Sequence, residues 1–381
     1  VWTDCPKMVS SWNGGYEFMK AIRKPQIETF IAQHIWMEDD CLMADLILPI
    51  NTKFEERDIN CDISSGNYNV LMIEDQSIAP LGESKSDYES TLAIAEKLGM
   101  TEKITGGETV EDKIKRGFEG SGITERISYE EFLDKECYIV PTAKGWEEDK
   151  AGFQRFYEDP ERYRLSTPSG KIEYYSPRLA EKFPDDKERM PYPRWVEKCE
   201  THPDERLTTP RAEKYPFLLV SNHPHWRLHS QMDDCTWLRE IETCKVVGPD
   251  GYKYEPLWIN PVDAEPLGIK TGDVVKIYNE RGWTLGGAYV TNRIIAHSVL
   301  QDHGARMDPI VPGESDRGGC NNLIAPKALA SKNCAGEVTS GYLVGIEKVD
   351  VFELAAQYPE AFSKPYDPDF GVMQAAWFDL D

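Results

Sequence analysis

Residues 257–290 read LWINPVDAEPLGIKTGDVVKIYNERGWTLGGAYV, and this stretch decides the fold of the C-terminal part of the chain. Its short apolar runs are separated by glycine-containing turns and lie at 257–260, 274–278 and 285–290. Such runs between turn residues are typical of β-strands. Closely spaced short strands with glycine turns predict a closed barrel. Further apolar runs at 217–220 and 342–349 extend the pattern, so we expect a barrel domain over residues 212–381.

The first 60 residues predict an α/β unit. Residues 15–23 have the pattern of a helix, residues 29–35 that of a buried strand, and residues 44–49 form a second apolar run. Short apolar strands beside helical segments are typical of a parallel sheet that helices cover on both faces. A capping box, Ser-Asp-Tyr-Glu, predicts a further helix over 86–98, which we expect to pack on this mostly parallel sheet. The N-terminal part is therefore predicted to belong to doubly wound α/β layers.

Residues 61–211 connect these two parts and differ from both. Prolines recur through 141–214 amid dense charge, which predicts a long irregular connection. The stretch also holds too many aromatic side chains for a free linker, so we expect it to lie ordered against a neighbouring part. The predicted organisation is an α/β segment at 1–60, the rest of the α/β layer with the connection at 61–211, and the barrel at 212–381.

Charge and composition exclude several classes of function. The 381 residues include 43 Lys and Arg against 66 Asp and Glu, which gives a formal net charge of −23. A surface this acidic repels phosphate backbones and anionic lipids, so we expect neither nucleic-acid binding nor membrane binding. The longest apolar stretch, around residues 42–50, is short and contains Asp45, so we expect no membrane insertion.

The nine cysteines form no CxxC pair. This argues against a zinc ribbon, a thioredoxin-type site and a cysteine-ligated iron–sulfur cluster. An odd number of irregularly spaced cysteines indicates reduced thiols, and we therefore expect a cytoplasmic protein. An exported protein is the alternative, because Val1 is not an initiator methionine and we expect the sequence to be a piece of a longer chain.

The densest polar cluster is SNHPHWRLHSQ at residues 221–231, directly after an apolar strand. One interpretation is a metal site, since His223 and His225 would face the same way in an extended chain. Pro224 and the lack of a nearby carboxylate disfavour a metal, and we expect no metal ligand here. The second interpretation is a cofactor with phosphates and a heteroaromatic ring, which hydroxyls, imidazoles, amides and Arg227 could bind. The third is a polar loop that satisfies its own hydrogen bonds.

A second polar cluster covers 304–309 and 315–322 and is rich in glycine and asparagine. Glycines let backbone N–H groups approach a ligand, and asparagine amides recognise both donors and acceptors. A surface loop made of turn residues is the alternative. The sequence has no GxxxxGK[ST], strand-linked GxGxxG, HExxH, GxSxG or EF-hand motif, so a simple nucleotide-binding, zincin or hydrolase function has no support.

Several stretches, in the same order, resemble the molybdopterin oxidoreductases of the dimethyl-sulfoxide-reductase family, in the C-terminal half of their large subunit. They are FIAQHIWME (30–38), ADLILP (44–49), FEERD (54–58), PLGESKSDY (80–88), TPSGKIE (167–173), the 221–231 cluster, and NPVDA with the following glycine turns (260–282). The resemblance implies a double-psi-like β-barrel at the C-terminus. It also implies bis-molybdopterin guanine dinucleotide as the cofactor, with molybdenum or tungsten coordinated through the cofactor.

The resemblance assigns residues to this cofactor. Those expected near one nucleotide are Gln33, Trp36, Glu38 and Asp58. Those expected near the pterins are Ser221, His223, Arg227, His229, Ser230 and Asn322, and Asn222 and Asp308 are also expected to bind the cofactor. The protein ligand of the metal lies in the family's other half, so no metal ligand is expected here. We expect replacement of Arg227 or His229 by Ala to lower cofactor occupancy while leaving the fold largely intact.

Within the family, residues 250–254 and 315–320 are most similar to the transhydroxylase, resorcinol hydroxylase and catechol dehydroxylase branch. This implies a small phenolic substrate, an N-terminal half of the large subunit and an iron–sulfur electron-transfer subunit as partners. Tyr68, in the stretch 64–68, is the candidate catalytic residue that exchanges a proton with the substrate; an interface aromatic is its alternative role. Three other functions stay open: an S- or N-oxide reductase, a non-catalytic module that keeps the fold, and an unrelated acidic metallohydrolase that uses the histidines.

Overall fold

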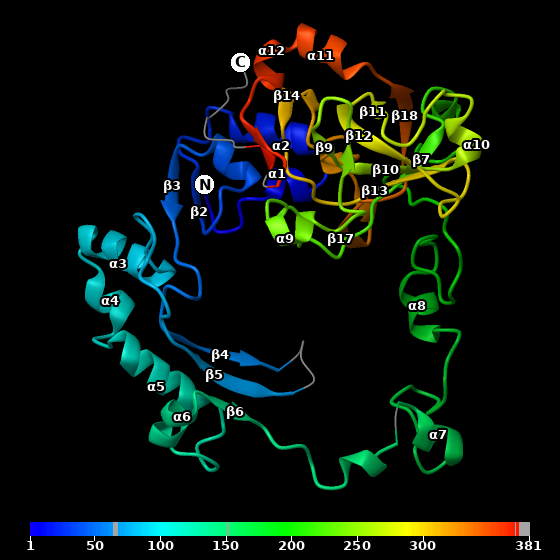
Figure 1. Ribbon diagram of the computed structural model, residues 1–381. Coiled ribbons are helices and arrows are strands. Elements are labelled where there is room, and N and C mark those ends of the chain that lie inside the picture. The colour runs from blue at the N-terminus through cyan, green and yellow to red at the C-terminus, as the bar shows by residue number, and fades with distance from the viewer. Residues whose placement is uncertain (64–67, 151, 370, 373–381) are drawn as a thin grey trace. The chain divides into compact units, whose positions relative to one another are not determined.

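The computed structural model describes residues 1–63, 68–150, 152–369 and 371–372 (Figure 1). It divides into two compact units, Val1–Ile47 with Arg178–Asp381, and Leu48–Pro177. These borders differ from the predicted ones at 60 and 211, because the N-terminal segment shares its core with the barrel. Met19 and Phe30 belong to the same buried cluster as Leu323 and the barrel strands.

A closed six-stranded barrel forms the centre of the first unit. Its strands are β7 (Phe217–Val220), β10 (Pro256–Ile259), β11 (Val274–Asn279), β12 (Gly282–Val290), β13 (Ser298–Gln301) and β18 (Tyr342–Lys348). They pair in the order β10-β13-β7-β18-β11-β12, and parallel pairing of β12 with β10 closes the ring. Two short strands, β14 (Pro309–Val311) and β15 (Ser315–Asp316), continue from β12. The predicted barrel is confirmed.

Alternation of side chains fills the barrel. In β11, Val275 and Ile277 are fully buried and belong to the main core, whereas Lys276 between them faces outward. This is the two-residue period of a strand with one face in a core. Gly287 in β12 is required by close packing, since a Cβ there would lie 2.5 Å from the Cβ of Val246. The glycine turns read from the sequence therefore include a position where the barrel wall admits no side chain.

The N-terminal segment forms a small α/β layer in the same unit. Its elements are β1 (Trp2–Thr3), α1 (Met8–Ser11), α2 (Gly15–Ile22), β2 (Ile31–His34), the 3₁₀ helix η1 (Asp39–Met43) and β3 (Leu46–Pro49). The three strands form a sheet in the order β1-β2-β3, with β1 parallel to β2. The predicted helix and strands are confirmed, and each end lies within two residues of its predicted position. Glycine at the start of α2 and a buried stripe that includes Tyr16, Met19 and Ile22 explain the helix.

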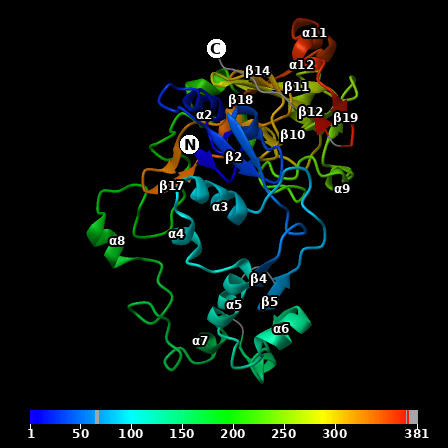
Figure 2. The same ribbon diagram turned by 90° about the vertical axis from the view of Figure 1, so that its left-hand side faces the viewer.

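The second unit holds an antiparallel sheet and several helices (Figure 2). The strands are β4 (Asp58–Asp62), β5 (Val70–Glu74) and β6 (Cys137–Ile139), and the helices are α3 (Asp87–Lys97), α4 (Thr101–Thr105), α5 (Val110–Gly120) and α6 (Tyr129–Lys135). The capping box that predicted α3 is present, with both hydrogen bonds between Ser86 and Glu89. Phe118 and Phe132 stack at 5.1 Å in the core of this unit.

One expectation is not tested within this unit. The described sheet of the second unit is antiparallel and α3 packs beside α4, so packing of the helix at 86–98 on the mostly parallel sheet of the N-terminal segment stays a prediction. The antiparallel direction follows from the short connection between β4, which ends at Asp62, and β5, which begins at Val70. Parallel neighbours need a crossover of a dozen or more residues, whereas a short connection returns the chain antiparallel.

The remaining elements are short. They are η2 (Trp146–Glu148), α7 (Gln154–Glu158), α8 (Pro177–Lys182), η3 (Pro210–Glu213), α9 (Thr236–Arg239), β8 (Val246–Val247), β9 (Lys253–Tyr254), α10 (Pro261–Ala264), η4 (Asn321–Leu323), β16 (Leu329–Ser331), β17 (Cys334–Glu337), α11 (Val351–Gln357), α12 (Pro359–Phe362), β19 (Tyr366–Asp367) and β20 (Gly371–Val372). The irregular connection is confirmed, and its end is ordered: Thr201 Oγ1 donates to the carbonyl of Leu329 at 2.6 Å. In the described part of the chain, no helix has the length and apolarity needed to cross a membrane.

Candidate functional site

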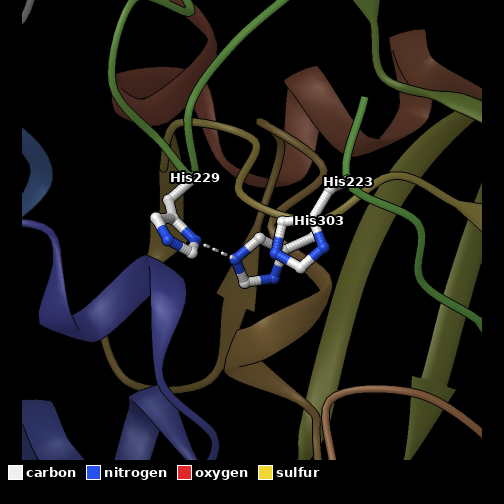
Figure 3. A group of neighbouring side chains, drawn as sticks. All are labelled: His223, His229 and His303. Carbon is white, nitrogen blue, oxygen red and sulfur yellow. Dashed lines mark hydrogen bonds between the residues drawn. The ribbon is translucent and has the colours of Figure 1, made fainter. Parts of the chain in front are cut away.

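Three histidines meet where two parallel strands of the barrel end (Figure 3). Strand β7 runs into the 221–231 loop, which carries His223 and His229, and β13 runs into His303. Because β7 and β13 pair in parallel, their carboxyl ends lie at the same edge of the sheet. The ring centroid of His303 lies 4.8 Å from that of His223 and 5.1 Å from that of His229. Sequence reasoning missed His303 and paired His223 with His225 instead; a strand at 298–301 was the signal that could have found it.

The two loops are locked together around His303. Its Nε2 shares a hydrogen bond of 2.8 Å with Nδ1 of His229, drawn in Figure 3. Its backbone N–H donates to the carbonyl of Asn222 at 2.8 Å. His229 has a left-handed φ of +56°, and a Cβ on Gly304 would lie 2.1 Å from the carbonyl oxygen of His229. The contact therefore requires glycine at 304.

Burial keeps two of the imidazoles neutral. Together with the nearby His223 and His229, it lowers the pKa of His303 to about 4. Burial also lowers the pKa of His229. A neutral imidazole offers one N–H donor and one nitrogen lone pair, so at neutral pH these rings can both donate and accept.

The Arg227 guanidinium is fully buried, and its N–H groups donate hydrogen bonds to other residues of this chain. It donates to Glu255 at 2.8 and 3.1 Å, to Asp233 at 3.1 Å and to the backbone carbonyl of His303 at 3.0 and 3.1 Å. Lys245 completes the network, with Nζ 2.8 Å from Glu255 and 3.0 Å from Asp233. Two positive and two negative charges thus compensate one another away from water. Arg227 positions His303, and its full use inside the protein argues against the predicted direct contact with a cofactor.

A second buried network joins the N-terminal layer to the cluster at 304–309. The Glu38 carboxylate is 2.8 Å from the guanidinium of Arg306, which also lies 2.6 Å from Asp234. Burial raises the pKa of Glu38 to about 8, although Arg306 lowers it. Asp39 accepts the backbone N–H of Met307 at 2.9 Å. The structure therefore brings predicted Glu38 to the second polar cluster, through an arginine that sequence reasoning did not single out.

The other predicted residues have more varied places. In the first unit, Gln33 accepts from Trp2 Nε1 at 3.0 Å, Trp36 is 47% exposed, and the Asp308 carboxylate is bound by Lys364 at 2.7 Å and Tyr252 at 3.2 Å. In the second unit, Asp58 begins β4 and lies 3.3 Å from Lys53. Tyr68 is 63% exposed there, while residues 64–67, which precede it, lie outside the described residues.

Several buried polar atoms around the histidines have no hydrogen-bond partner among the described residues. They are Ser221 Oγ, Ser230 Oγ, His303 Nδ1, Asn321 Oδ1 and Asn322 Oδ1. An unsatisfied buried polar atom costs about 1–3 kcal/mol, so such atoms gather where a ligand or water completes them. Hydroxyls, amide oxygens and imidazoles of this kind fit the edges of a large polar heterocycle. Four of the five belong to residues predicted from the sequence or lie next to them.

Two family models match the parts of the chain that build this site. The molybdopterin oxidoreductase model matches residues 15–97, and the molydopterin dinucleotide binding domain matches residues 217–337. The second range contains all three histidines, the Arg227 network and the unsatisfied amides. The chain belongs to the molybdopterin oxidoreductase family.

Relatives cover nearly the whole chain. It is 31% identical to the pyrogallol hydroxytransferase large subunit of Pelobacter acidigallici over 363 residues, 87% of this chain and 41% of that protein. It is 32% identical to the trimethylamine-N-oxide reductase of Haemophilus influenzae over 366 residues, 88% of this chain and 41% of that protein. It is 31% identical to the dimethyl sulfoxide reductase DmsA of Escherichia coli over 350 residues, 89% and 40% respectively. The chain thus spans about two-fifths of the length of these relatives.

A solved structure shows the same fold. The acetylene hydratase from Pelobacter acetylenicus matches with a TM-score of 0.57 over 89% of this chain and 42% of that chain, at 17% identity. The α/β elements followed by a barrel are therefore the fold of this molybdopterin oxidoreductase, as the sequence predicted.

The molybdopterin oxidoreductase and dinucleotide-binding family models imply molybdenum bis-molybdopterin guanine dinucleotide as the cofactor. The unsatisfied atoms at the ends of β7 and β13 fit the pterin part of such a group, with Ser221, Ser230 and Asn322 as hydrogen-bonding residues. When bound, the cofactor supplies a redox-active, Lewis-acidic metal centre. The site residues taken from the resemblance stay predictions, with the placements given above.

Proposed function

We propose that the chain is the C-terminal, cofactor-binding half of a molybdenum or tungsten enzyme that transfers, adds or removes a hydroxyl group on a small phenolic substrate. The observation that carries the cofactor role is the group of three histidines and unsatisfied polar atoms at the ends of β7 and β13. The 31% identity to a pyrogallol hydroxytransferase large subunit supports the substrate class.

The residues of this chain would hold and orient the pterin. His229 and His303 can each donate one hydrogen bond and accept another, while Arg227 keeps the His303 backbone fixed. Glu38, whose pKa burial raises and which pairs with Arg306, is the proposed carboxyl group beside one nucleotide. Rigid placement of such groups limits the reorganisation that binding costs.

The proposal includes Tyr68 as the group that exchanges a proton with a phenolic oxygen. Its side chain is 63% exposed within its unit and so is available for such a contact. General acid–base groups contribute about 10²–10⁴-fold to rate. In the complete enzyme, Tyr68→Phe should therefore lower kcat/KM by at least about 100-fold while leaving cofactor content unchanged. A change within about twofold would assign Tyr68 a packing role.

The proposed partners are an N-terminal half that completes the large subunit and an iron–sulfur subunit that exchanges electrons with it. The name of the Pelobacter relative, a large subunit, supports the presence of a further subunit. We also propose a cytoplasmic location and a role in anaerobic metabolism of phenols.

A second function is an S- or N-oxide reductase, favoured by the 32% identity to a trimethylamine-N-oxide reductase. The test is to assay the complete enzyme with trihydroxybenzenes and, separately, with trimethylamine N-oxide and dimethyl sulfoxide plus a reduced electron donor. The proposal expects hydroxyl transfer or removal on the phenols and no oxide reduction. The reverse pattern would replace it by the second function.

A further inference from the structure

We propose that His223, His229 and His303 form a binding site for one zinc-class divalent transition-metal ion on chains that carry no pterin. The proposal concerns the histidines themselves and does not depend on the substrate. It reverses the expectation that this loop supplies no metal ligand, which rested on Pro224 and on the lack of a nearby carboxylate. The structure joins His303 to the group, and one nitrogen from each ring lies within 4.8 Å of the others (Figure 3).

The distances suit a tetrahedral ion after a small movement. Zinc–nitrogen bonds of about 2.0–2.1 Å place tetrahedral ligand nitrogens about 3.3 Å apart. The His229–His303 pair, at 2.8 Å, is already near this separation. His223 is exposed, so its side chain is free to rotate toward the other two. Two of the three ligand rings are thus already held in place, and the third reaches the ion by rotating its side chain.

His229 and His303 can bind an ion through a change of tautomer, without gaining or losing a proton. His229 and His303 now share one hydrogen between Nδ1 and Nε2. When both nitrogens bind the ion, this hydrogen moves to the other nitrogen of the ring that donated it, and each ring stays neutral. A ligating histidine usually donates its second N–H to a nearby acceptor. Asn322 interacts with His303, and its Oδ1 has no partner among the described residues, so a small side-chain movement would make it the acceptor for Nδ1.

The composition of the site selects the ion. Three imidazoles favour zinc, cobalt, nickel or copper over magnesium or calcium, which prefer oxygen ligands. The cluster contains no carboxylate or thiolate among the described residues. Three protein ligands leave the fourth tetrahedral position to water, so the ion should exchange and should be removable by a chelator.

The test uses the full chain prepared without pterin, with Co²⁺ as a spectroscopic probe and Zn²⁺ for calorimetry. Its thiols are first blocked with iodoacetamide, because the nine free cysteines include exposed ones that could bind metal themselves. The informative variant is His223→Ala, since an exposed side chain can be removed without disturbing the core. The matched control is His225→Ala, which removes another exposed histidine of the same loop.

We expect one ion per chain, with the visible absorption of tetrahedral Co²⁺, in the wild type and in His225→Ala. His223→Ala should bind at least about tenfold more weakly, since even loss of a supporting contact costs about 10–100-fold. Zn²⁺ should raise the Tm of the wild type and the control more than that of His223→Ala. Lack of stoichiometric binding, or equal affinity in the two variants, would overturn the proposal.

Discussion

At the scale of single residues, His303 connects the parts of the candidate site. Its ring shares a hydrogen bond with His229, its N–H donates to Asn222, and its carbonyl accepts from Arg227. A residue fixed at three points loses little further freedom when a ligand binds. The buried charges behind it, Arg227 with Glu255, therefore serve the site through His303.

Arg227→Ala should destabilise the fold by about 3–5 kcal/mol, the cost of removing one partner from a buried ion-pair network. The physical reason is that Glu255 and Asp233 would stay buried with Lys245 as their remaining cation in the network. This differs from the expectation that the fold stays largely intact, which treated Arg227 as a surface donor. Urea unfolding measures the effect, with replacement of the exposed Arg194 by Ala as control. Equal stability of the two variants would contradict it.

From the sequence we could predict that the polar residues of the site follow a strand. We could not predict which residues distant in the chain they contact. The 221–231 loop was identified because it follows an apolar strand. His303 was not, because its place beside that loop depends on the pairing of β7 with β13, which are far apart in the chain. The internal use of Arg227 was missed for a similar reason, since Glu255 is supplied from next to β10.

At the scale of elements, the parallel pairing of β7 and β13 makes the site possible. It places two loop starts at one edge, and Gly304 lets the second loop pass directly against His229. The strands themselves supply the rigid support, because their side chains are fully buried at Leu219 and Val299. Loop residues mounted on such a support are a usual arrangement for binding sites.

Gly304→Ala and Gly251→Ala form a matched pair that tests this contact. Both glycines have a left-handed φ, +78° and +79°, but a Cβ at 304 meets the His229 carbonyl at 2.1 Å, whereas a Cβ at 251 meets nothing within 4 Å. Backbone strain is thus the same in both variants. Gly304→Ala should be less stable than Gly251→Ala by about 1–3 kcal/mol, the cost of overpacking. Equal unfolding free energies would show that the two loops do not touch.

Elements with local signals were predictable from the sequence, and their pairing was less so. The capping box placed α3, and apolar runs between glycines placed β7, β10, β11 and β12. The sheet of the second unit was not predicted, because the direction of its strands depends on the connection, and periodicity alone does not report it. Strand β13 was also missed, since Ser298 and Gln301 interrupt its short apolar run.

At the scale of the whole molecule, the chain divides into two compact units and spans about two-fifths of the length of its relatives in the molybdopterin oxidoreductase family. The larger unit carries the dinucleotide-binding domain and a set of buried carboxyl groups. Burial is the main cause of their raised pKa values: about 8 for Glu38, about 7 for Asp40 and Asp316, and about 6 for Asp39 and Asp302.

These groups predict that stability falls as pH rises. A carboxyl whose folded pKa lies above its unfolded value binds more protons in the folded state between the two values. Their contribution to the unfolding free energy should therefore decrease from about pH 4 to about pH 8, while the lowered pKa of His303 acts in the opposite direction below about pH 6.5, so the net decrease is expected in the upper part of this window. Tm measured across that upper part should drop, and Glu38→Gln should reduce the drop. A Tm that rises toward pH 8 would contradict the prediction.

The measurement that tests the central claim most directly is pterin and molybdenum per polypeptide in the complete enzyme carrying His229→Ala, beside the control His225→Ala. The account places His229 in the group that contacts the pterin and His225 outside it. It predicts a clear loss of both pterin and molybdenum in His229→Ala, with normal content in the control and the same far-ultraviolet circular dichroism in both. Full occupancy of both components in His229→Ala would contradict the account.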